Sequence, residues 1–456
     1  MMKVLLTVLR IPDLRKKIMF TLLMIIVFRI GAHITVPGIN FQVLEDYFKQ
    51  AAGGAKGLTD YIDLFAGGAF KRLSLFALGI MPYISASIIM QLLMVVVPNL
   101  QRLAKEGEYG RRKINQYTRY GTVVLCALQS YGITVYISSL NVQMPGIIEG
   151  GDSLGFVLLT ILTITTGTIF LMWLGELMTE RGIGNGVSLL IFAGIISGAP
   201  SAVATFWADV QNPTGTLDML LVLILIVIFV IMIGLSIILS EGQRKIPLNY
   251  GKKIVGRKIY QGTSQVLPIK VNAANVMPII FASSLLLFPS QIASYLEGSY
   301  PGFSAAIQAY LAPGSLVQMF LYIVLIVFFA YFYTAIQYNP KDLAEALKKN
   351  GGFIPGVRPG SETEEYIEYV LNRITLAGAL FLAFIAIAPD LIINIWDLQK
   401  YSNMAYLFGG TSLLITVGVT LDTLKQIHSQ LVMRNYEGFL DKSRRSPIKA
   451  RVGIVR

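Results

Sequence analysis

The sequence predicts an all-α polytopic membrane protein with ten transmembrane helices, and three observations support this prediction. Of the 456 residues, 54% are hydrophobic and 14% are charged, whereas soluble domains carry about 25% charged residues. The apolar residues lie in long runs without any charge, such as residues 153–175 and 271–296. Each run is long enough to cross a hydrocarbon core of about 30 Å, which takes about 20 helical residues. Finally, basic residues gather in alternate connections between the runs.

Ten spans result when the apolar runs are trimmed at proline, glycine and polar clusters. The first span contains Arg29 and the ninth ends at Asp390, so these two have the weakest apolar signals. Basic residues precede the first span as in a secretory signal peptide, but no small-residue cleavage site follows Arg29, and we expect a retained anchor. The predicted spans are residues 18–36, 76–97, 117–137, 154–174, 183–203, 217–240, 275–296, 316–335, 374–395 and 404–426.

Lysine and arginine are concentrated on one side of this predicted topology. With the amino terminus in the cytoplasm, the cytoplasmic segments hold 32 of the 38 basic residues. Connections that are rich in Lys and Arg remain on the cytoplasmic side of a membrane. We therefore expect a multi-pass protein with both termini in the cytoplasm.

The spans divide into two groups of five at a polar stretch. We expect residues 1–203 to form a first half, residues 204–216 an external hinge loop, residues 217–430 a second half, and residues 431–456 a basic cytoplasmic tail. Because five is odd, the second group enters the membrane from the opposite side. Any structural kinship between the halves would then be an inverted repeat, although the halves have no convincing similarity residue by residue.

Two cytoplasmic connections are longer than a turn between helices requires. Residues 241–273 and 337–373 each exceed 30 residues, while connections between packed elements usually take a few. Contact with anionic lipid explains most of the +12 net charge. The extra length of these two loops predicts that they also dock a cytoplasmic partner.

The sequence lacks the patterns of common catalytic and metal sites. Cys126 is the single cysteine, and His33 and His428 are the only histidines. An internal disulfide is therefore excluded, and a His-based metal site or catalytic triad is not expected. The sequence contains neither a nucleotide-binding G-x-x-x-x-G-K-[ST] loop nor an H-E-x-x-H motif. We expect no metal, no cofactor and no enzymatic activity.

The external stretch before the second span does not fit an ordinary loop. Its last part, residues 61–75, reads YIDLFAGGAFKRLSL and is too short to span a bilayer. It predicts either a helix on the membrane surface or a segment that folds back into a cavity of the protein. The residues alone favour the surface helix.

Several long strings of residues resemble the SecY family of bacterial protein-conducting channels. They extend over all ten spans and are FRIGAHITVPGI (28–39), LGIMPYISASIIMQLL (78–93), KEGEYGRRKINQYTRY (105–120), ERGIGNGVSLLIFAGI (180–195), EGQRKIPLNY (241–250), MPIIFASSLLLFP (277–289), NPKDLAEALKKNGGFIPGVRPG (339–360) and FGGTSLLI (408–415). The resemblance implies two inverted five-helix halves around a central pore in the cytoplasmic (inner) membrane of a bacterium. It also implies passage of unfolded secretory polypeptides, and release of signal sequences and membrane helices into lipid through a lateral gate.

The resemblance assigns two groups of residues to the pore. An aliphatic ring, which can part around a passing chain while offering ions no polar ligand, would consist of Ile84, Ile88, Val187, Ile191, Ile280 and Ile415. A plug helix at about residues 61–75 would close the outer funnel through Tyr61, Leu64, Phe65, Gly67, Gly68 and Phe70. Gly67 and Gly68 would give this helix a mobile joint. Without the resemblance, each ring residue would be read as an ordinary core residue.

The resemblance also implies a gate and a docking surface. The lateral gate would lie between spans two and three and spans seven and eight, with the candidates Ser87, Gln91, Gln129 and Asn275; polar contacts between helices are the alternative role for these side chains. Arg257 and Arg358 would dock partners, because a guanidinium pairs with phosphate or carboxylate, and a solvated loop arginine is the alternative. The implied partners are the SecE and SecG subunits, the SecA motor, the ribosome, secretory polypeptides with their signal sequences, and membrane lipid.

Two other classes of protein compete with this interpretation. A secondary solute transporter built from inverted five-span repeats would show saturable uptake of a small molecule by the chain alone. An intramembrane enzyme would need a catalytic motif, and the sequence offers none.

Overall fold

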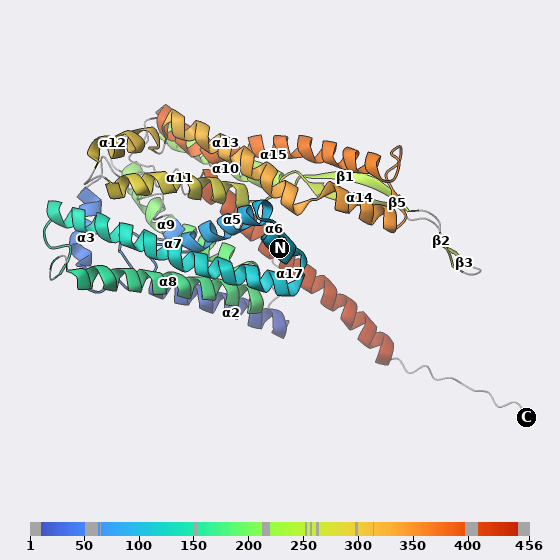
Figure 1. The fold of residues 1–456 in the computed structure, drawn as a ribbon, viewed down its shortest axis with the longest axis horizontal. Helices are drawn as coiled ribbons and strands as arrows, with labels where there is room; N and C mark the ends of the chain where they lie inside the picture. The colour runs from blue at the N-terminus through green and yellow to red at the C-terminus, as the bar shows by residue number, and fades with distance from the viewer. Residues whose placement is uncertain are drawn as a thin grey trace, which may run out of the picture.

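The computed structural model describes residues 11–50, 63, 65–149, 151, 153–211, 219–250, 253–255, 258–260, 264–296, 300–312, 314–396 and 409–445. Most of these residues are helical, and the long helices run roughly along the long axis of the molecule (Figure 1). The helices are α2 (Pro12–Gly31), α3 (Phe41–Gln50), α5 (Met81–Val96), α6 (Pro98–Lys105), α7 (Glu108–Gln143), α8 (Leu154–Arg181), α9 (Gly186–Gln211), α10 (Met219–Glu241), α11 (Met277–Leu296), α12 (Pro301–Tyr310), α13 (Leu316–Gln337), α14 (Pro340–Lys349), α15 (Ser361–Trp396) and α17 (Gly410–Arg445).

A helix of the structure overlaps each predicted span, namely α2, α5, α7, α8, α9, α10, α11, α13, α15 and α17, although α2 ends at Gly31 and α5 begins at Met81, inside the predicted spans 18–36 and 76–97. Within the described ranges, 6 helices are long and apolar enough to cross a membrane, or 7 if α5 and α6, which meet at a bend of 100°, form one span. The helical, multi-pass membrane class is therefore confirmed. The count of ten crossings stays a prediction.

Local sequence explains how the helices begin and which faces they expose. The hydroxyl of Ser153 caps α8 by accepting a hydrogen bond from the Phe156 amide at 3.2 Å, and Ser315 caps α13 in the same way. Pro98 begins α6, where its missing N–H leaves no helical hydrogen bond unmade. Helix α10 is apolar over nearly its whole length and only 11% of its most apolar window is buried inside the protein, as expected of a helix that faces lipid.

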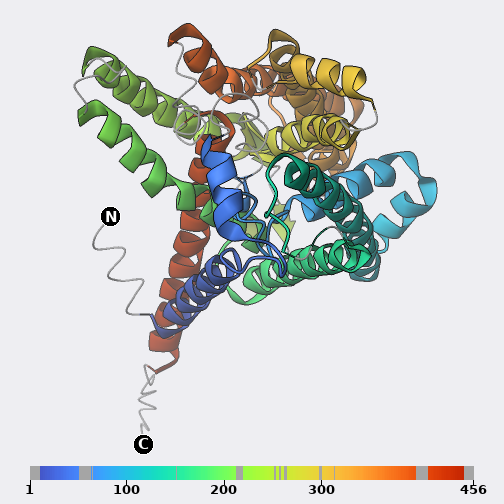
Figure 2. The same ribbon diagram turned by 90° about the vertical axis from the view of Figure 1, so that its left-hand side faces the viewer.

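Packing joins the helices into two groups that touch along two seams. In the first group α7 packs against α5 and α8, and α8 packs against α2 and α9; in the second, α13 packs between α11 and α15, and α17 packs against α10 and α15. The seams are formed by α9 with α17, and by α11 with α5 and α7. Figure 2 looks along the helices and shows teal α7 and green-teal α8 opposite the yellow and orange helices of the second group.

The two long loops of residues 241–273 and 337–373 add a small β-sheet that was not predicted from the sequence. Strand β1 (Gln243–Tyr250) pairs with β4 (Ser264–Lys270) and with β5 (Gly352–Phe353), so the sheet joins both loops in the order β4-β1-β5. A separate two-stranded ribbon consists of β2 (Lys253–Val255) and β3 (Lys258–Tyr260).

A separate apolar core lies beneath the three-stranded sheet. Ile246 and Leu248 are buried on β1 while their neighbours Lys245 and Pro247 are more accessible, because alternate residues of a strand face opposite sides. We call the buried residues of this unit the sheet core; it consists of Ile246, Leu248, Ile269, Ile354, Ile367 and Leu371. The two predicted loops therefore form one packed unit rather than two separate connections.

Several predicted boundaries differ from the observed ones. The expected hinge loop 204–216 is helical as far as Gln211, because residues 204–212 contain neither proline nor glycine; residues 212–218 lie outside the described ranges. The predicted tail also begins as helix, since α17 continues to Arg445. The basic connection 98–119 consists largely of α6 and the first turns of α7.

Candidate pore and plug segment

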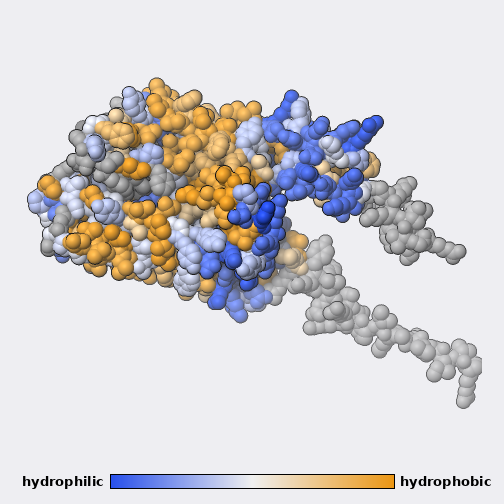
Figure 3. Space-filling view, viewed as in Figure 1, coloured by the Kyte–Doolittle hydropathy of each residue, from blue (hydrophilic) through white to orange (hydrophobic). Residues whose placement is uncertain are grey.

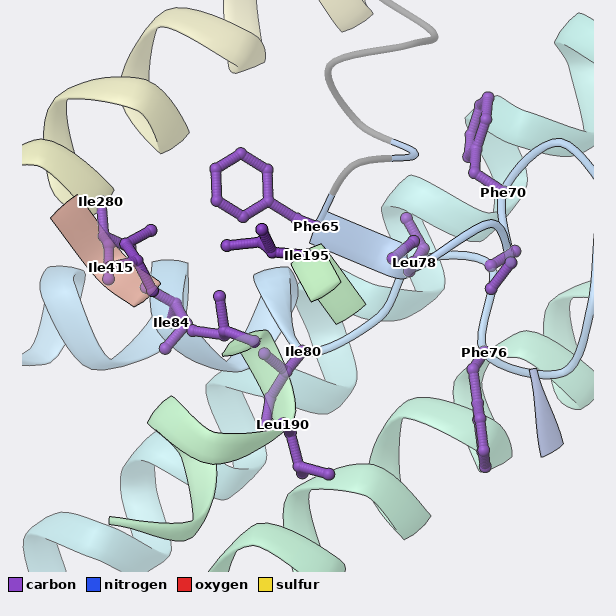
Figure 4. Close-up of a cluster of buried hydrophobic side chains, with 14 of the residues drawn as sticks. Phe65, Phe70, Phe76, Leu78, Ile80, Ile84, Leu190, Ile195, Ile280 and Ile415 are labelled. Carbon is purple, nitrogen blue, oxygen red and sulfur yellow. The ribbon is translucent and has the colours of Figure 1, made fainter. Parts of the chain in front are cut away.

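Aliphatic side chains from four helices meet where the two groups of helices face each other. Ile84 and Ile88 on α5, Ile191 on α9, Ile280 on α11 and Ile415 on α17 belong to one buried cluster, and between 1% and 7% of each is exposed. Val187 is less buried and packs against the same cluster. Figure 4 shows Ile84, Ile280 and Ile415 close together, although they come from three different helices. Three of the six predicted ring residues therefore lie close together and the other three belong to or pack against the same large core; the ring and its role as a constriction stay predictions.

Ile195 belongs to the same cluster and was missed in the sequence analysis. It is 1% exposed and lies beside Phe65 (Figure 4). Val187, Ile191 and Ile195 are spaced by four residues, which places all three on one face of α9. The same helical spacing would have identified Ile195 from the sequence. We call Ile84, Ile88, Ile191, Ile195, Ile280 and Ile415 the aliphatic cluster.

The predicted plug segment folds into the protein, so the expectation of a surface helix is wrong. Every residue from 65 to 80 is buried or half-buried, and Phe65, Ala66 and Phe70 belong to the large core cluster. Helical geometry occurs at Asp63, Phe65 and Ala66 and gives way to turns and bends from residue 67 to residue 80, apart from an isolated β-bridge between Ser74 and Thr35. Tyr61 and Leu64 lie outside the described ranges.

Backbone conformation explains why the helix does not continue to residue 75. Gly67 and Gly68 have φ values of 68° and 86°, and Leu73 has a φ of 41°. These values lie in the left-handed region, which glycine adopts without a steric penalty and which leucine adopts rarely. The predicted helix of residues 61–75 is therefore shorter than expected, and a compact turn takes its place.

The carboxylate of Asp63 closes this turn on itself. Its Oδ1 atom accepts hydrogen bonds from the backbone amides of Phe70 at 3.0 Å and Lys71 at 3.2 Å. The ammonium group of Lys71 lies 3.9 Å from Oδ2 of the same carboxylate. These contacts hold residues 63 and 65–72 in one compact unit, which we call the plug turn.

The segment that follows the plug turn is held firmly by two neighbouring elements. The Val36 amide donates to the Leu73 carbonyl at 3.0 Å, and the Leu75 amide donates to the Ile34 carbonyl at 2.8 Å. The ring of Phe76 stacks between those of Phe28 and Phe170, with centroid distances of 6.0 and 6.1 Å. Figure 4 shows Phe76 at some distance from Phe65 and Ile195.

The lateral-gate candidates lie on elements that border one seam. Helix α11 packs against both α5 and α7. Ser87 and Gln91 are neighbours on α5, with a 3.5 Å contact between the Gln91 amide nitrogen and the Ser87 hydroxyl, and Gln129 is buried on α7. Asn275 lies before α11 rather than within it, with a φ of 52°, and its carbonyl accepts a hydrogen bond from the Asn272 side chain at 3.0 Å.

Of the two candidate docking arginines, the structure describes only Arg358. Arg257 lies outside the described ranges. Arg358 lies between β5 and α15, and its side chain is 88% exposed. The Thr363 hydroxyl donates to the Arg358 carbonyl at 2.7 Å, which fixes the backbone of this turn while the guanidinium remains accessible.

The surface divides into an apolar body and a hydrophilic end. A hydrophobic surface covers much of the helical body, while hydrophilic residues gather at the end that carries α14 and the β-sheet (Figure 3). Arg358 belongs to this hydrophilic end through its position next to β5. Among the described residues, no group of three or more His, Cys, Asp or Glu side chains has an arrangement that would hold a metal ion.

The comparisons of this sequence with known proteins agree on one family. Residues 74–424 match the family model described as SecY. A curated relative, the protein translocase subunit SecY of Aquifex aeolicus, is 46% identical over 433 residues, which cover 94% of this chain and 97% of that protein.

Solved structures of low sequence identity share the fold. A protein conducting channel matches with a TM-score of 0.65 at 22% identity, covering 92% of this chain and 93% of the other. A SecY structure that concerns how the plug domain stabilises the closed state and maintains a membrane seal matches with a TM-score of 0.59 at 20% identity, covering 92% of each chain. The Sec61 channel of a canine ribosome-channel complex matches with a TM-score of 0.61 at 20% identity, covering 92% and 93%.

Proposed function

Since the chain belongs to the SecY family of protein-conducting channels, we propose that its aliphatic cluster is the constriction through which an unfolded polypeptide passes. The protein is a translocation channel of the membrane. The observation that carries the proposal is the origin of the cluster: its side chains come from α5 and α9 of one helix group and from α11 and α17 of the other. Because both groups of helices contribute to the constriction, it opens when the two groups move apart, and neither group has to unfold.

The chemistry of this constriction suits a channel that has to remain tight to ions. Aliphatic side chains give an ion no ligand to replace its water, so a narrow ring of them resists wetting. An extended polypeptide needs no specific partner here, because the ring contacts whichever side chains pass. The plug turn lies against the same cluster through Phe65, which supports its assignment as the plug of the closed channel.

In this proposal ten helices cross the cytoplasmic membrane of a bacterium, with both termini in the cytoplasm. Residues 1–203 and 217–430 are the two inverted halves, and the connection between them acts as the hinge. The concentration of basic residues on one side of the topology supports the orientation.

The seam at α11 is the proposed lateral gate. Helices α5 and α7 of one group contact α11 of the other there, and parting them would connect the pore with lipid. A signal sequence or membrane helix would then leave sideways, driven by the transfer free energy of its own apolar side chains.

We assign the docking of cytoplasmic partners to the sheet unit and its exposed Arg358. Basic, solvent-exposed loops offer a surface for ribosomal RNA phosphates or for acidic groups of the SecA motor. The ribosome-bound Sec61 channel among the similar structures supports the ribosome as one partner. The SecE and SecG subunits complete the proposed complex, and its substrates are secretory polypeptides.

Crosslinking to a stalled secretory chain tests the constriction. In a Cys126→Ser background, a cysteine replaces Ile84 or Ile280, and the stalled chain carries a single cysteine. We expect a disulfide at both positions. A matched cysteine at Leu223, which is 63% exposed on the lipid-facing α10, should give none. Absence of crosslinks at Ile84 and Ile280 in a complex that still translocates protein would exclude the proposed constriction.

A further inference from the structure

The plug turn approaches α9 more closely than any side chain would allow. At Gly194 of α9, an added Cβ would lie 2.8 Å from the carbonyl oxygen of Phe65. At Gly67, an added Cβ would lie 2.9 Å from the Cα of Gly194. Both contacts involve backbone atoms, which cannot move aside as the end of a flexible side chain does. The two glycines therefore allow backbone-to-backbone contact between the turn and the helix.

A single arginine holds the turn at this contact. Arg29, in the last turn of α2, donates a hydrogen bond from Nη1 to the Gly67 carbonyl at 2.8 Å. No ion pair of Arg29 occurs among the described residues. Hydrogen bonds from a charged donor are stronger than those between neutral groups, and this one gives the half-buried guanidinium a partner. It therefore connects the charge of Arg29 to the closed position of the plug turn.

The hydroxyl of Ser197 lies near the same carbonyl but contributes less. It lies 3.2 Å from the Gly67 oxygen and 2.6 Å from the Gly194 oxygen. A hydroxyl donates one proton at a time, and the shorter contact is with Gly194 within α9 itself. Arg29 is therefore the principal donor to the turn.

The two ends of the segment are held in different ways. After residue 72, backbone hydrogen bonds and the stacked ring of Phe76 fix the chain between α2 and α8. The plug turn, by contrast, is closed internally by Asp63 and carries apolar side chains that pack in the core; at Gly67 its backbone meets α2 and α9 through the hydrogen bonds from Arg29 and Ser197 and through a close glycine contact. Its internal bonds persist if it leaves α9.

We propose that Arg29 and Gly194 form a latch that holds the plug turn closed, and that the turn swings as one unit about Leu73 when the latch opens. This inference rests on the proposed function of the segment as a plug. Gly67 then serves as the docking point of the plug, and the joint lies at Leu73, whose φ of 41° marks the change from turn to anchored segment. A chain entering the pore opens the latch by displacing Phe65 from the aliphatic cluster.

The test measures how often the plug turn becomes accessible in the purified, reconstituted complex. Ala69 is fully buried in the turn, so a cysteine there, in a Cys126→Ser background, reports opening through its rate of reaction with a membrane-impermeant maleimide. We expect Arg29→Gln to raise this rate at least about tenfold, the lower end of the equilibrium effect of losing a hydrogen bond to a charged group. Arg29→Lys keeps the charge and should restore part of the protection.

Gly194→Ala tests the same latch from the other side, because its methyl group would push the Phe65 carbonyl away. We expect an increase of at least tenfold, and Gly234→Ala on α10, where an added Cβ meets nothing within 4 Å, should leave the rate unchanged. Ser197→Ala should raise it less than threefold. If the complex with Arg29→Gln does not assemble, the reaction rate measured for Gly194→Ala tests the latch by itself.

Rates within twofold of the parent for both Arg29→Gln and Gly194→Ala would overturn the latch. Translocation of a secretory chain is measured in the same vesicles. A parent complex that moves no polypeptide would contradict the proposed function itself, whereas normal translocation with unchanged rates would contradict only the latch.

Discussion

The aliphatic cluster and the sheet core are both made of buried aliphatic side chains, but they join different parts of the chain. The sheet core packs β1, β4 and α15, which all belong to the second group of helices. The aliphatic cluster joins helices of both groups, whose largest contacts lie along the two seams. In our proposal, burial of the same residue type therefore serves stability in one place and a reversible seal in the other.

The surroundings of the two clusters strengthen this difference. At the hydrophilic end of the molecule, side chains of the sheet core would face water if the unit opened, and burial of each is worth about 1.5–3 kcal/mol. In the aliphatic cluster, a passing polypeptide would replace the contacts that separation of the groups removes. Loss of contacts in the sheet core should lower stability, and loss of contacts in the aliphatic cluster should mainly affect leakage.

The largest expected effect is on the stability of the sheet. Ile246→Ala removes a buried side chain of β1 and should lower the free energy of unfolding of this unit by about 2–5 kcal/mol, because a cavity remains. Hydrogen exchange of the β1 and β4 amides would measure the change. Val266→Ala on β4, where the side chain is 53% exposed, is the control and should change it by less than about 0.5 kcal/mol. Equal effects of both variants would contradict the assignment of Ile246 to a core.

The next effect concerns the seal. Ile280→Ser places a hydroxyl in the aliphatic cluster, where it would help water to wet the constriction. We expect several-fold faster ion flux through the reconstituted complex in the absence of substrate. The same substitution at Ile226, exposed on α10, should leave the flux unchanged. If Ile280→Ser gave no more leakage than Ile226→Ser, the cluster would be a static core like that of the sheet.

The smallest effect on folding is expected at Arg358. Its 3.8 Å ion pair with Glu362 is exposed, and such pairs contribute at most about 1 kcal/mol. Arg358→Glu should therefore weaken motor-driven export while the thermal unfolding of the complex stays nearly constant. Arg112→Glu on α7, which breaks an exposed 3.8 Å ion pair with Glu108 outside the two long loops, provides a charge-matched control and should leave export unchanged. A parallel loss of folded protein and export would indicate a structural role for Arg358 instead.

The sequence predicted the helices well because their signal is local. Uncharged runs of about 20 residues have few alternatives to a membrane helix, and a helix lies at each predicted span. The sheet was missed because Ile246 and Leu248 form an alternation of only two buried residues, and the pairing of β1 with β5 joins residues about 100 positions apart.

Less of the candidate site could be predicted from the sequence. Helical spacing relates Ile84 to Ile88 and Ile191 to Ile195, but it does not indicate that α5, α9, α11 and α17 meet. The resemblance selected the predicted ring residues and not Ile195. The inward fold of the plug turn depends on space left by Gly194 on α9 and on a hydrogen bond from Arg29 on α2. Gly67 is visible in the sequence of the turn, but its partners Arg29 and Gly194 lie far from it along the chain.

The most direct test of the account compares crosslinks from one stalled chain to both clusters. A single cysteine in the chain would be paired in turn with cysteines at Ile84, Ile280, Ile415 and Ile246 of the Cys126→Ser protein. We predict that a stalled chain of one length forms crosslinks with the cysteines at Ile84, Ile280 and Ile415 and not with the cysteine at Ile246. The first three positions belong to three helices from both groups. Reaction at only one group of helices, or equal reaction at Ile246, would contradict passage of the polypeptide through the aliphatic cluster.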